Sequence, residues 1–440
     1  MNETFLKSIK KAHFIGIGGI GVSAIARLML ARGVSVSGSD RGSSRVTDGL
    51  AELGAQITFG HKAENISPDT NVVIYSPAVL DENPELAHAR KKGIKAYTYP
   101  ETLGLISEGM KTIAISGTHG KTTTTAMVAE VLAKATKSPT VIVGSLLQKS
   151  GSNFVKGESD LFVVEACEYK RSFLNLSPTI LVITNIDNDH LDYYKDIDDI
   201  ISAFHEIAMK VPKTGFIVAD ANNKNIKKAL RGVKAKIIDY TKIKPRGKFE
   251  LGVSGDHNIK NAKAVIAVAN ILKVPISATL SALKGFQGTW RRMELKGKMK
   301  SSALLYDDYA HHPTEVKATL QGFRAKFPNK NIRVVFQPHL YSRTKLLLDD
   351  FAQAFNDADE VILAPIYAAR EELDPTITSE ILADRMKAHH KHTGAFDGLP
   401  SIEKYINKTA KKGDVVVTMG AGNVYEIAKN ILPKRKNKKV

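Results

Sequence analysis

Two glycine-rich segments carry residue types that bind phosphate groups. The stronger one spans residues 117–123 and reads Gly-Thr-His-Gly-Lys-Thr-Thr. In such a loop, backbone N–H groups surround phosphate oxygens, the lysine neutralises transferred charge, and the following hydroxyl can bind Mg²⁺. The loop is shorter than a standard phosphate loop, because the nearest earlier glycine lies only three residues before Gly120. We therefore predict an ATP-binding loop made by Gly117, Thr118, His119, Gly120, Lys121, Thr122 and Thr123.

The other segment matches G-x-G-x-x-G after an apolar run, with Gly16, Gly18, Gly19, Ile20 and Gly21. Such glycines let the backbone approach a diphosphate at a helix N-terminus, and a later acid, here Asp40, takes a ribose hydroxyl. This loop alone fits NAD, a UDP-sugar or, least well, a tight turn without a ligand. An oxidoreductase has no use for the ATP-binding loop. Both loops together therefore favour a ligase or kinase-like reaction on a nucleotide-linked substrate.

Side chains suited to a cation or substrate follow two later apolar runs. Glu165 ends the run 161–165, and His190 follows the run 180–185. Side chains at the carboxyl ends of parallel strands meet ligands. A carboxylate suits Mg²⁺, whereas histidine is an unusual ligand for it, so the residues alone favour a His190 that is buried and hydrogen-bonded among Asp187, Asp189 and Asp192. We also expect Glu168 and Arg171 to face the substrate and Cys167 to be packed near the site.

The chain repeats a short β-rich run, a turn and a segment with helical periodicity, which predicts an α/β fold with mostly parallel sheets. We expect three domains, with boundaries at 1–108, 109–291 and 292–440. The expected strands include 34–37, 72–75, 111–116, 161–165, 180–185, 303–306, 333–336, 360–364 and 415–419.

Composition limits the function classes. The 440 residues carry a formal net charge of +18 and a single cysteine. The lone cysteine excludes a disulfide framework and fits a reducing compartment, so we expect a cytoplasmic protein. The apolar runs are too short to span a bilayer, so no membrane insertion is expected. Basic residues at 434–439 indicate a solvated end. Without basic and aromatic residues interleaved in a binding module, we expect no nucleic-acid binding.

Taken together, the motifs resemble those of the Mur ligase family, over almost the whole chain and in family order. Besides the two loops, the resemblance rests on Glu165-Ala-Cys-Glu-Tyr, Thr184-Asn-Ile-Asp-Asn-Asp-His-Leu-Asp, His257-Asn-Ile-Lys-Asn-Ala, Tyr306-Asp-Asp-Tyr-Ala-His-His-Pro-Thr-Glu and Phe336-Gln-Pro-His-Leu-Tyr-Ser-Arg-Thr. It implies a Rossmann-like UDP-binding domain, a P-loop-type ATPase domain with a central mostly parallel sheet, and a Rossmann-like C-terminal domain that binds an amino acid.

The resemblance also implies an activity and roles for residues. It implies an ATP-dependent ligase of peptidoglycan biosynthesis that joins UDP-N-acetylmuramate to L-alanine through an acyl phosphate, as a monomer or homodimer. Lys121, Arg292 and His190 would be catalytic, and Thr122, Glu165 and His190 would hold Mg²⁺. The remaining implied contacts are Asn258, Asn261, Arg292 and Asp308 for ATP, Asp40 and His119 with the first loop for the sugar nucleotide, and Tyr309, His311 and Arg343 for the amino acid. Ordinary helix capping is an alternative for Asn258, and Arg291 is expected to be solvated.

Two departures from the family pattern affect the amino-acid region. Leu340 stands where many members have a second arginine, and Ala310 where many have a glycine. The closest competing function is the recycling ligase that attaches a tripeptide to the same sugar nucleotide. It typically reads Asn-Asn-Leu-Glu-Phe-Asp-His where this chain has Thr184-Asn-Ile-Asp-Asn-Asp-His. More distant alternatives are a nucleic-acid-stimulated NTPase, an NAD oxidoreductase and a non-catalytic sugar-nucleotide-binding module.

Overall fold

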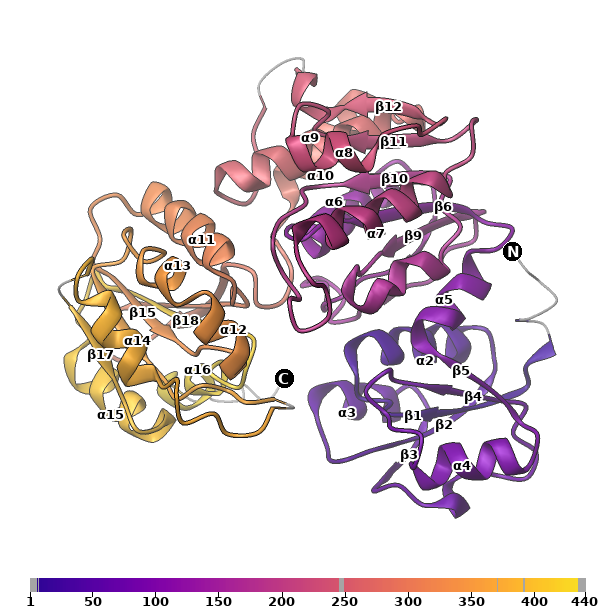
Figure 1. Cartoon of the computed structure of the whole chain (residues 1–440), viewed down its shortest axis with the longest axis horizontal. Coiled ribbons are helices and arrows are strands. Elements are labelled where there is room, and N and C mark those ends of the chain that lie inside the picture. Colours follow the sequence, from indigo (N-terminus) through magenta and orange to yellow (C-terminus); the bar gives the residue numbers. More distant parts are fainter. Residues whose placement is uncertain (1–5, 7, 245–248, 370, 391, 434–440) are drawn as a thin grey trace, which may run out of the picture. The chain divides into compact units, whose positions relative to one another are not determined.

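The computed structural model describes residues 6, 8–244, 249–369, 371–390 and 392–433 (Figure 1). The basic end at 434–439 lies outside the described residues. The chain forms two compact units. Unit 1 comprises Met1–Gly252 and Lys260–Gln287, and unit 2 comprises Val253–Ile259 and Gly288–Val440. Three mostly parallel sheets confirm the predicted α/β fold. Within the described residues, no helix has both the length and the hydropathy needed to cross a membrane.

The first sheet of unit 1 has the strand order β3-β2-β1-β4-β5, and all its pairings are parallel. From β1, the chain adds strands first on one side (β2, β3) and then on the other (β4, β5), so the sheet has a topological switch point beside β1. Ligands bind at such a point, outside the carboxyl ends of the strands. The first glycine loop lies there, between β1 and α2. The elements are β1 Lys11–Ile15, α2 Ile20–Ala31, β2 Ser35–Asp40, α3 Arg45–Ala51, β3 Gln56–Phe59, η1 Ala63–Asn65, β4 Val72–Tyr75, α4 Pro84–Lys91, β5 Lys95–Thr98 and α5 Tyr99–Ser107.

The second sheet of unit 1 has the order β12-β11-β10-β6-β9-β7-β8 and is parallel except at β8. Its central strand β6 is almost wholly buried, as expected for a strand covered on both faces, and it leads into the second glycine loop. The elements are β6 Lys111–Ser116, α6 Lys121–Lys134, β7 Thr140–Ile142, β8 Phe154–Val155, β9 Leu161–Glu165, η2 Tyr169–Asn175, β10 Ile180–Ile183, α7 Ile197–Met209, β11 Phe216–Ala219, α8 Lys224–Ala229, β12 Lys236–Asp239, η3 Tyr240–Lys242, α9 Asp256–Ile271 and α10 Ile276–Gly285.

One hydrophobic core joins the two sheets of unit 1. Phe14 of β1 and Leu28 of α2 belong to the same buried cluster as Phe162 of β9 in the second sheet. Helix α5 packs on η2, and the approach is so close that a Cβ at Gly104 would lie 2.6 Å from the Asn175 carbonyl oxygen. This shared core fixes the two glycine loops relative to each other.

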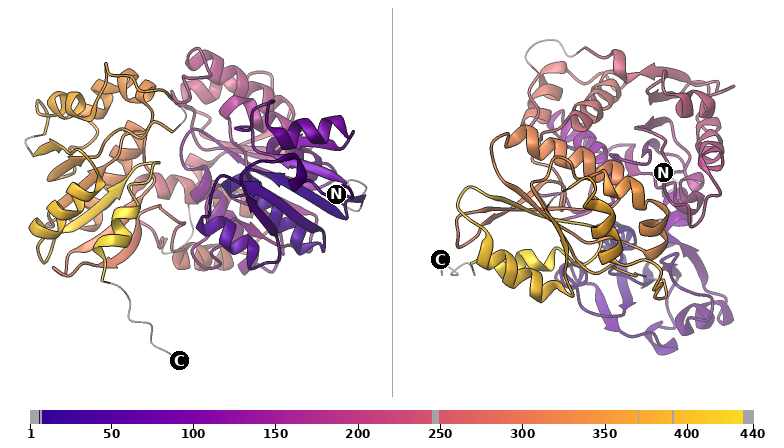
Figure 2. Two further views of the ribbon diagram at one scale, coloured as in Figure 1. Left: turned by 90° about the horizontal axis from the view of Figure 1, so that it is seen from below. Right: turned by 60° about the vertical axis from the view of Figure 1, so that its left-hand side comes forward.

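Unit 2 contains the third sheet, with the order β13-β14-β18-β15-β16-β17, parallel except at β13. Helices α11, α13 and α14 bury one face, and α15 and α16 bury the other, as the two views of Figure 2 show. The elements are β13 Glu294–Lys298, β14 Leu304–Asp308, α11 Pro313–Lys326, β15 Ile332–Phe336, α12 Tyr341–Leu346, α13 Leu348–Ala352, β16 Glu360–Leu363, α14 Ser379–Met386, β17 Thr393–Ala395, α15 Leu399–Thr409, β18 Val415–Met419 and α16 Glu426–Ile431.

Candidate active site

The first glycine loop is held by the end of β2. The N–H groups of Gly16 and Ile17 donate to the Ser39 carbonyl oxygen at 2.9 and 3.0 Å. The Asp40 carboxylate accepts from Gly18 N–H at 2.7 Å, and a Cβ at Gly18 would lie 2.8 Å from that carboxylate. Asp40, predicted to take a ribose hydroxyl, therefore also fixes the loop itself. Gly19 caps α2, whose N-terminal N–H groups can bind an anion.

The second glycine loop is braced by the segment after β10. The His119 N–H donates to Asn185 Oδ1 at 2.9 Å, and the Thr184 hydroxyl donates to the His119 carbonyl oxygen at 2.6 Å. At Gly117, where φ is +130°, a Cβ would lie 2.0 Å from Thr184 Oγ1, so only glycine fits. Residues 117–120 therefore form a rigid turn before α6, and Lys121, Thr122 and Thr123 are the first three residues of that helix.

Lys121 forms a buried ion pair at this loop. Its Nζ donates to the carbonyl oxygens of Gly117 and Thr118 at 2.6 and 3.0 Å and to Glu168 Oε1 at 2.9 Å. Burial opposes the charged lysine, but the Glu168 carboxylate prevails and raises the pKa of Lys121. Burial opposes the charged Glu168 as well, and Lys121 lowers the pKa of that carboxyl. Glu168, expected to face the substrate, therefore holds the predicted catalytic lysine.

The predicted magnesium ligands Thr122 and Glu165 are in contact. The Thr122 hydroxyl donates to Glu165 Oε1 at 3.0 Å, and the Gly144 N–H donates to Glu165 Oε2 at 2.8 Å. Glu168 Oε2 is buried and has no hydrogen-bond partner among the described residues. Hydroxyl and carboxylate oxygens are the donors that Mg²⁺ prefers, and a cation would satisfy the unpaired oxygen. The residues present therefore fit a magnesium ion.

His190 lies beside the same carboxylates, with φ at +54°. Its Nε2 is 3.6 Å from Glu168 Oε1 and 3.8 Å from Asp189 Oδ2, and its ring centroid is 4.7 Å from that of Tyr169. The side chain is 21% exposed, so it is accessible to a ligand and is not fully buried among the neighbouring aspartates.

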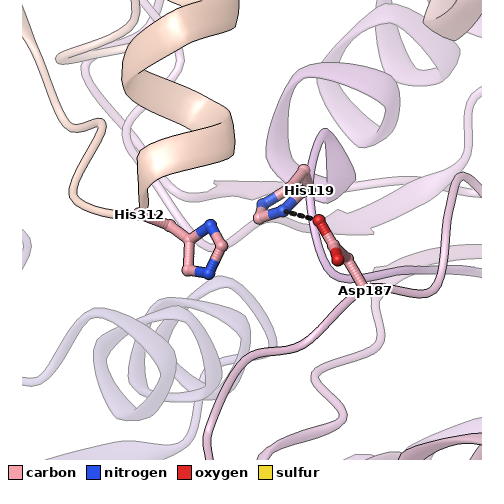
Figure 3. Close-up of side chains that lie close together, drawn as sticks. All are labelled: His119, Asp187 and His312. Atoms are coloured by element: carbon pink, nitrogen blue, oxygen red, sulfur yellow. Dashed lines mark hydrogen bonds and ion pairs between the residues drawn. The ribbon is translucent and has the colours of Figure 1, made fainter. Parts of the chain in front are cut away.

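Three further predicted residues are His119 in the second glycine loop and Asn258 and Asn261 in helix α9. His119 Nε2 lies 3.4 Å from Asp187 Oδ2 (Figure 3). Asn261 lies against the loop, since a Cβ at Gly120 would be 2.7 Å from Asn261 Oδ1. Asn258 is buried and its Nδ2 donates to the Ser254 carbonyl oxygen at 2.7 Å. Helix α9 begins at Asp256, so Asn258 is inside the first turn and does not cap the helix.

A residue that we did not predict connects helix α2, which follows the first glycine loop, to the segment of Val143 and Gly144. Asn153 is fully buried, and its Nδ2 donates to the Ile20 carbonyl oxygen and to Ser23 Oγ, the latter at 2.8 Å. The Asn153 carbonyl oxygen accepts from Val143 N–H at 3.0 Å, next to the Gly144 that binds Glu165. No local pattern marks Asn153 or Gly144, because their partners are distant in the sequence.

In unit 2, the expectation that Arg291 is solvated is wrong. Its side chain is 3% exposed, and its Nε donates to Asp307 Oδ2 at 2.8 Å. Its terminal nitrogens donate to the carbonyl oxygens of Gly420 and Gly422 at 2.5 and 3.3 Å. The guanidinium also lies over the rings of Tyr309 and Tyr425. Arg291 thus anchors the segment that carries Arg292.

Arg292, Asp308 and Tyr309 form a second cluster of predicted residues in unit 2. The Arg292 guanidinium lies 5.4 Å from the centroid of the Tyr309 ring and 3.8 Å from Glu315. Asp308 is the last residue of β14, two residues beyond the predicted strand end, and accepts from the N–H groups of Met293 and Ala310 at 2.7 and 2.8 Å. Burial raises the pKa of Asp308 to about 6, although Arg292 acts in the opposite direction.

The predicted amino-acid-binding residues His311 and Arg343 both lie near His339, which we did not predict. The ring centroids of His311 and His339 are 5.9 Å apart, and an Arg343 terminal nitrogen is 3.3 Å from His339 Nδ1. Leu340 is buried and has φ at +71°, a conformation that strains a side-chain-bearing residue. Ala310 is buried without positive φ, so its backbone does not require the glycine found in many family members.

Two other expectations are wrong. Cys167 is exposed and not packed. Arg171, expected to face the substrate, binds Asp199 at 2.6 Å and Glu206, both in α7. Neither error was detectable locally, because exposure and pairing depend on how η2 packs on α7.

Comparisons with known proteins match most of the chain, including all three sheets. Three family models match: "Mur ligase family, catalytic domain" at residues 11–110, "Mur ligase middle domain" at 115–248 and "Mur ligase, glutamate ligase domain" at 291–422. A curated UDP-N-acetylmuramate–L-alanine ligase of Clostridium botulinum is 42% identical, covering 97% of this chain and 98% of that protein.

Two solved structures are similar over nearly the full length. The UDP-N-acetylmuramate-alanine ligase of Thermotoga maritima has a TM-score of 0.80 and 31% identity, covering 96% of this chain and 98% of that chain. A murein peptide ligase of Psychrobacter arcticus has a TM-score of 0.72 and 25% identity, with the same two coverages.

Proposed function

The chain belongs to the Mur ligase family, and we propose that it joins L-alanine to UDP-N-acetylmuramate with ATP. It is an ATP-dependent ligase that forms an amide bond and yields UDP-N-acetylmuramoyl-L-alanine for peptidoglycan biosynthesis. The support is the 42% identity over 97% of the chain to a curated ligase of that name and the full-length likeness to a solved one.

One structural observation carries the proposal. Unit 1 contains two phosphate-type loops, and the second presents Lys121 and Thr122 beside Glu165 and Glu168. Buried Asn153 connects α2, after the first loop, to the segment of Val143 and Gly144, whose N–H binds Glu165. An enzyme that activates a carboxylate on a nucleotide-linked sugar needs one loop for the diphosphate of the sugar nucleotide and one for ATP. An NAD oxidoreductase or a simple binding module does not need the second loop with its lysine and carboxylates.

In the first step, an oxygen of the muramoyl carboxylate attacks the γ-phosphorus of ATP. The bond to the bridging oxygen of ADP breaks, which leaves an acyl phosphate. Lys121 and Arg292 stabilise negative charge on the phosphoryl oxygens, the main catalytic task in such a transfer. When bound by Thr122, Glu165 and His190, Mg²⁺ would supply further positive charge to those oxygens. Lys121 must exchange its contacts with loop carbonyls for contacts with phosphate.

In the second step, the amine of L-alanine attacks the acyl carbon, the bond to phosphate breaks, and the amine loses a proton. Tyr309, His311 and Arg343 of unit 2 are the proposed alanine-binding residues. A guanidinium fork fits a carboxylate, and His339 beside Arg343 orients that fork. Many family members have a second arginine at the position of Leu340, and this chain lacks that positive charge. Arg343 is therefore the main cationic contact for the alanine carboxylate among the predicted residues.

The arrangement into domains 1–108, 109–291 and 292–440, a cytoplasmic location and a monomeric or homodimeric state are parts of the same proposal. Each predicted domain contains one of the three sheets. ATP and sugar nucleotides are cytoplasmic substrates, which supports the location.

The recycling ligase that adds a tripeptide has less support. The similar murein peptide ligase has the lower TM-score and identity of the two full-length structures, 0.72 and 25% against 0.80 and 31%. The segment Thr184-Asn-Ile-Asp-Asn-Asp-His also departs from the recycling type.

A phosphate-release assay tests the proposal. Purified protein is given ATP, Mg²⁺ and UDP-N-acetylmuramate, with L-alanine, with the tripeptide, or without an acceptor. We expect release with L-alanine only, and release by the Lys121→Ala variant that is slower by about 10²-fold or more. Release with the tripeptide alone would identify the recycling activity instead, and release without UDP-N-acetylmuramate would refute both.

A further inference from the structure

Tyr99 touches the first glycine loop with the hydroxyl-bearing end of its ring. A Cβ at Gly21 would lie 2.6 Å from Tyr99 Cζ and within 3.0 Å of both Cε atoms. Gly21 is the second residue of α2, where helix N–H groups bind an anion. The phenol therefore stands directly at the proposed diphosphate site, and glycine at this position makes room for it.

The backbone at Tyr99 is held firmly. Tyr99 is the first residue of α5, and Thr98 before it forms a capping box with Glu101, whose Oε2 accepts from Thr98 N–H at 2.7 Å. Pro100 follows in the first turn. A capped helix start fixes the direction of the side chain it carries. Tyr99 as a residue is partly exposed, so the fold does not enclose it fully.

The same place is close to the second glycine loop. Ile20, next to Gly21, has its carbonyl oxygen bound by Asn153, and the Asn153 carbonyl oxygen accepts from Val143 N–H. The next residue, Gly144, donates to Glu165. The pKa of Tyr99 is raised, mainly by burial and to a lesser extent by the Glu165 carboxylate and the Cys167 thiol. The effect of Glu165 agrees with the closeness of Tyr99 to the second glycine loop, and the raised pKa keeps the hydroxyl protonated.

A neutral donor at this point suits the proposed reaction. The diphosphate of the sugar nucleotide binds at α2, while its lactyl carboxylate must reach the phosphate bound beside Thr122 and Glu165. A carboxylate entering beside Glu165 and Glu168 meets like charge, and Lys121 is paired with Glu168. A phenol that keeps its proton donates a hydrogen bond there without needing a charge of its own.

We propose that Tyr99 is a substrate-binding residue whose hydroxyl donates a hydrogen bond to the muramoyl carboxylate of UDP-N-acetylmuramate. This inference rests on the proposed function and names a residue for the same site. The ring alone would serve packing against Gly21, whereas the hydroxyl serves the substrate, so the two roles are separable by Tyr99→Phe.

Titration calorimetry on the full-length protein without ATP tests the proposal. UDP-N-acetylmuramate and UDP-N-acetylglucosamine, which lacks the lactyl carboxylate, are each titrated into wild type, Tyr99→Phe and the control Tyr97→Phe. Loss of a hydrogen bond to a charged group should weaken UDP-N-acetylmuramate binding to Tyr99→Phe by about 10- to 100-fold. Binding of UDP-N-acetylglucosamine, the KM for ATP and the melting temperature should stay unchanged, and the control should match wild type.

Equal binding of UDP-N-acetylmuramate by Tyr99→Phe and wild type overturns the inference but leaves the proposed function intact. An equal loss for both sugar nucleotides also overturns it, because the hydroxyl then acts on the shared nucleotide part. If wild type releases no phosphate from ATP with UDP-N-acetylmuramate and L-alanine, the proposed function itself fails.

Discussion

Arg291 and Asp307 form a buried ion pair whose disruption should destabilise unit 2 strongly. The side chains are 3% and 1% exposed, and Nε to Oδ2 is 2.8 Å. Asp307→Asn keeps the shape and the acceptor for the Thr418 hydroxyl, which donates at 2.7 Å, but leaves the guanidinium without its counter-ion. Because arginine cannot lose its proton, the charge stays buried. We expect a loss of about 3–5 kcal/mol in unfolding free energy.

Arg291→Met should behave differently with pH. Burial already raises the pKa of Asp307, against the effect of Arg291. Without that cation, Asp307 can take up a proton and become neutral. A group whose pKa is raised on folding contributes stability at low pH that is lost as the pH rises through its folded value. The variant should therefore be closer to wild type at pH 5 than at pH 8, whereas Asp307→Asn should show no such recovery.

Trp290, the single tryptophan, reports on this region because it is adjacent to Arg291 and its ring lies 6.0 Å from Tyr425. Urea unfolding followed by its fluorescence measures the change. At roughly 2–4 °C per kcal/mol for a body of about 150–250 residues, the melting temperature of Asp307→Asn should fall by roughly 6–20 °C. A loss below about 1 kcal/mol in Asp307→Asn, or a pH-independent Arg291→Met, would refute this reasoning.

Three further predictions concern the site. Gly144→Ala places a Cβ 2.4 Å from Glu165 Oε1, so kcat should fall about 10²-fold and the Mg²⁺ requirement should rise, and a normal Mg²⁺ titration would contradict this. Lys121→Ala should lower kcat/KM by about 10²-fold or more in the phosphate-release assay, and a near-normal rate would show that the lysine does not act on phosphate. Asp308 has its pKa raised to about 6 from about 4, so its contribution to stability is present below pH 4 and lost as the pH rises through 6. Urea midpoints should fall over that window in wild type, and Asp308→Asn should remove the trend.

The sequence was sufficient for the features that depend on neighbours along the chain. Glycines directly after an apolar run and before a helical segment predict a strand-loop-helix unit that binds phosphate, and both loops are formed as expected. The burial of β6 and β10 follows from their apolar residues. Thr122 and Glu165 meet because Thr122 comes after β6, Glu165 ends β9, and these two strands are parallel neighbours in one sheet. These outcomes need only local geometry and the rule that parallel strands end at one edge.

The tertiary structure alone decided which charged and polar groups found partners. The sequence offered no reason to bury Arg291, because its partners are Asp307 in β14 and the carbonyl groups of Gly420 and Gly422 after β18, which only the folded sheet brings together. Asn153 connects α2 to the segment of Val143 and Gly144 for the same reason. A buried polar group costs free energy unless it is paired, so its role is set by the groups that the fold brings to it and not by its own residue type.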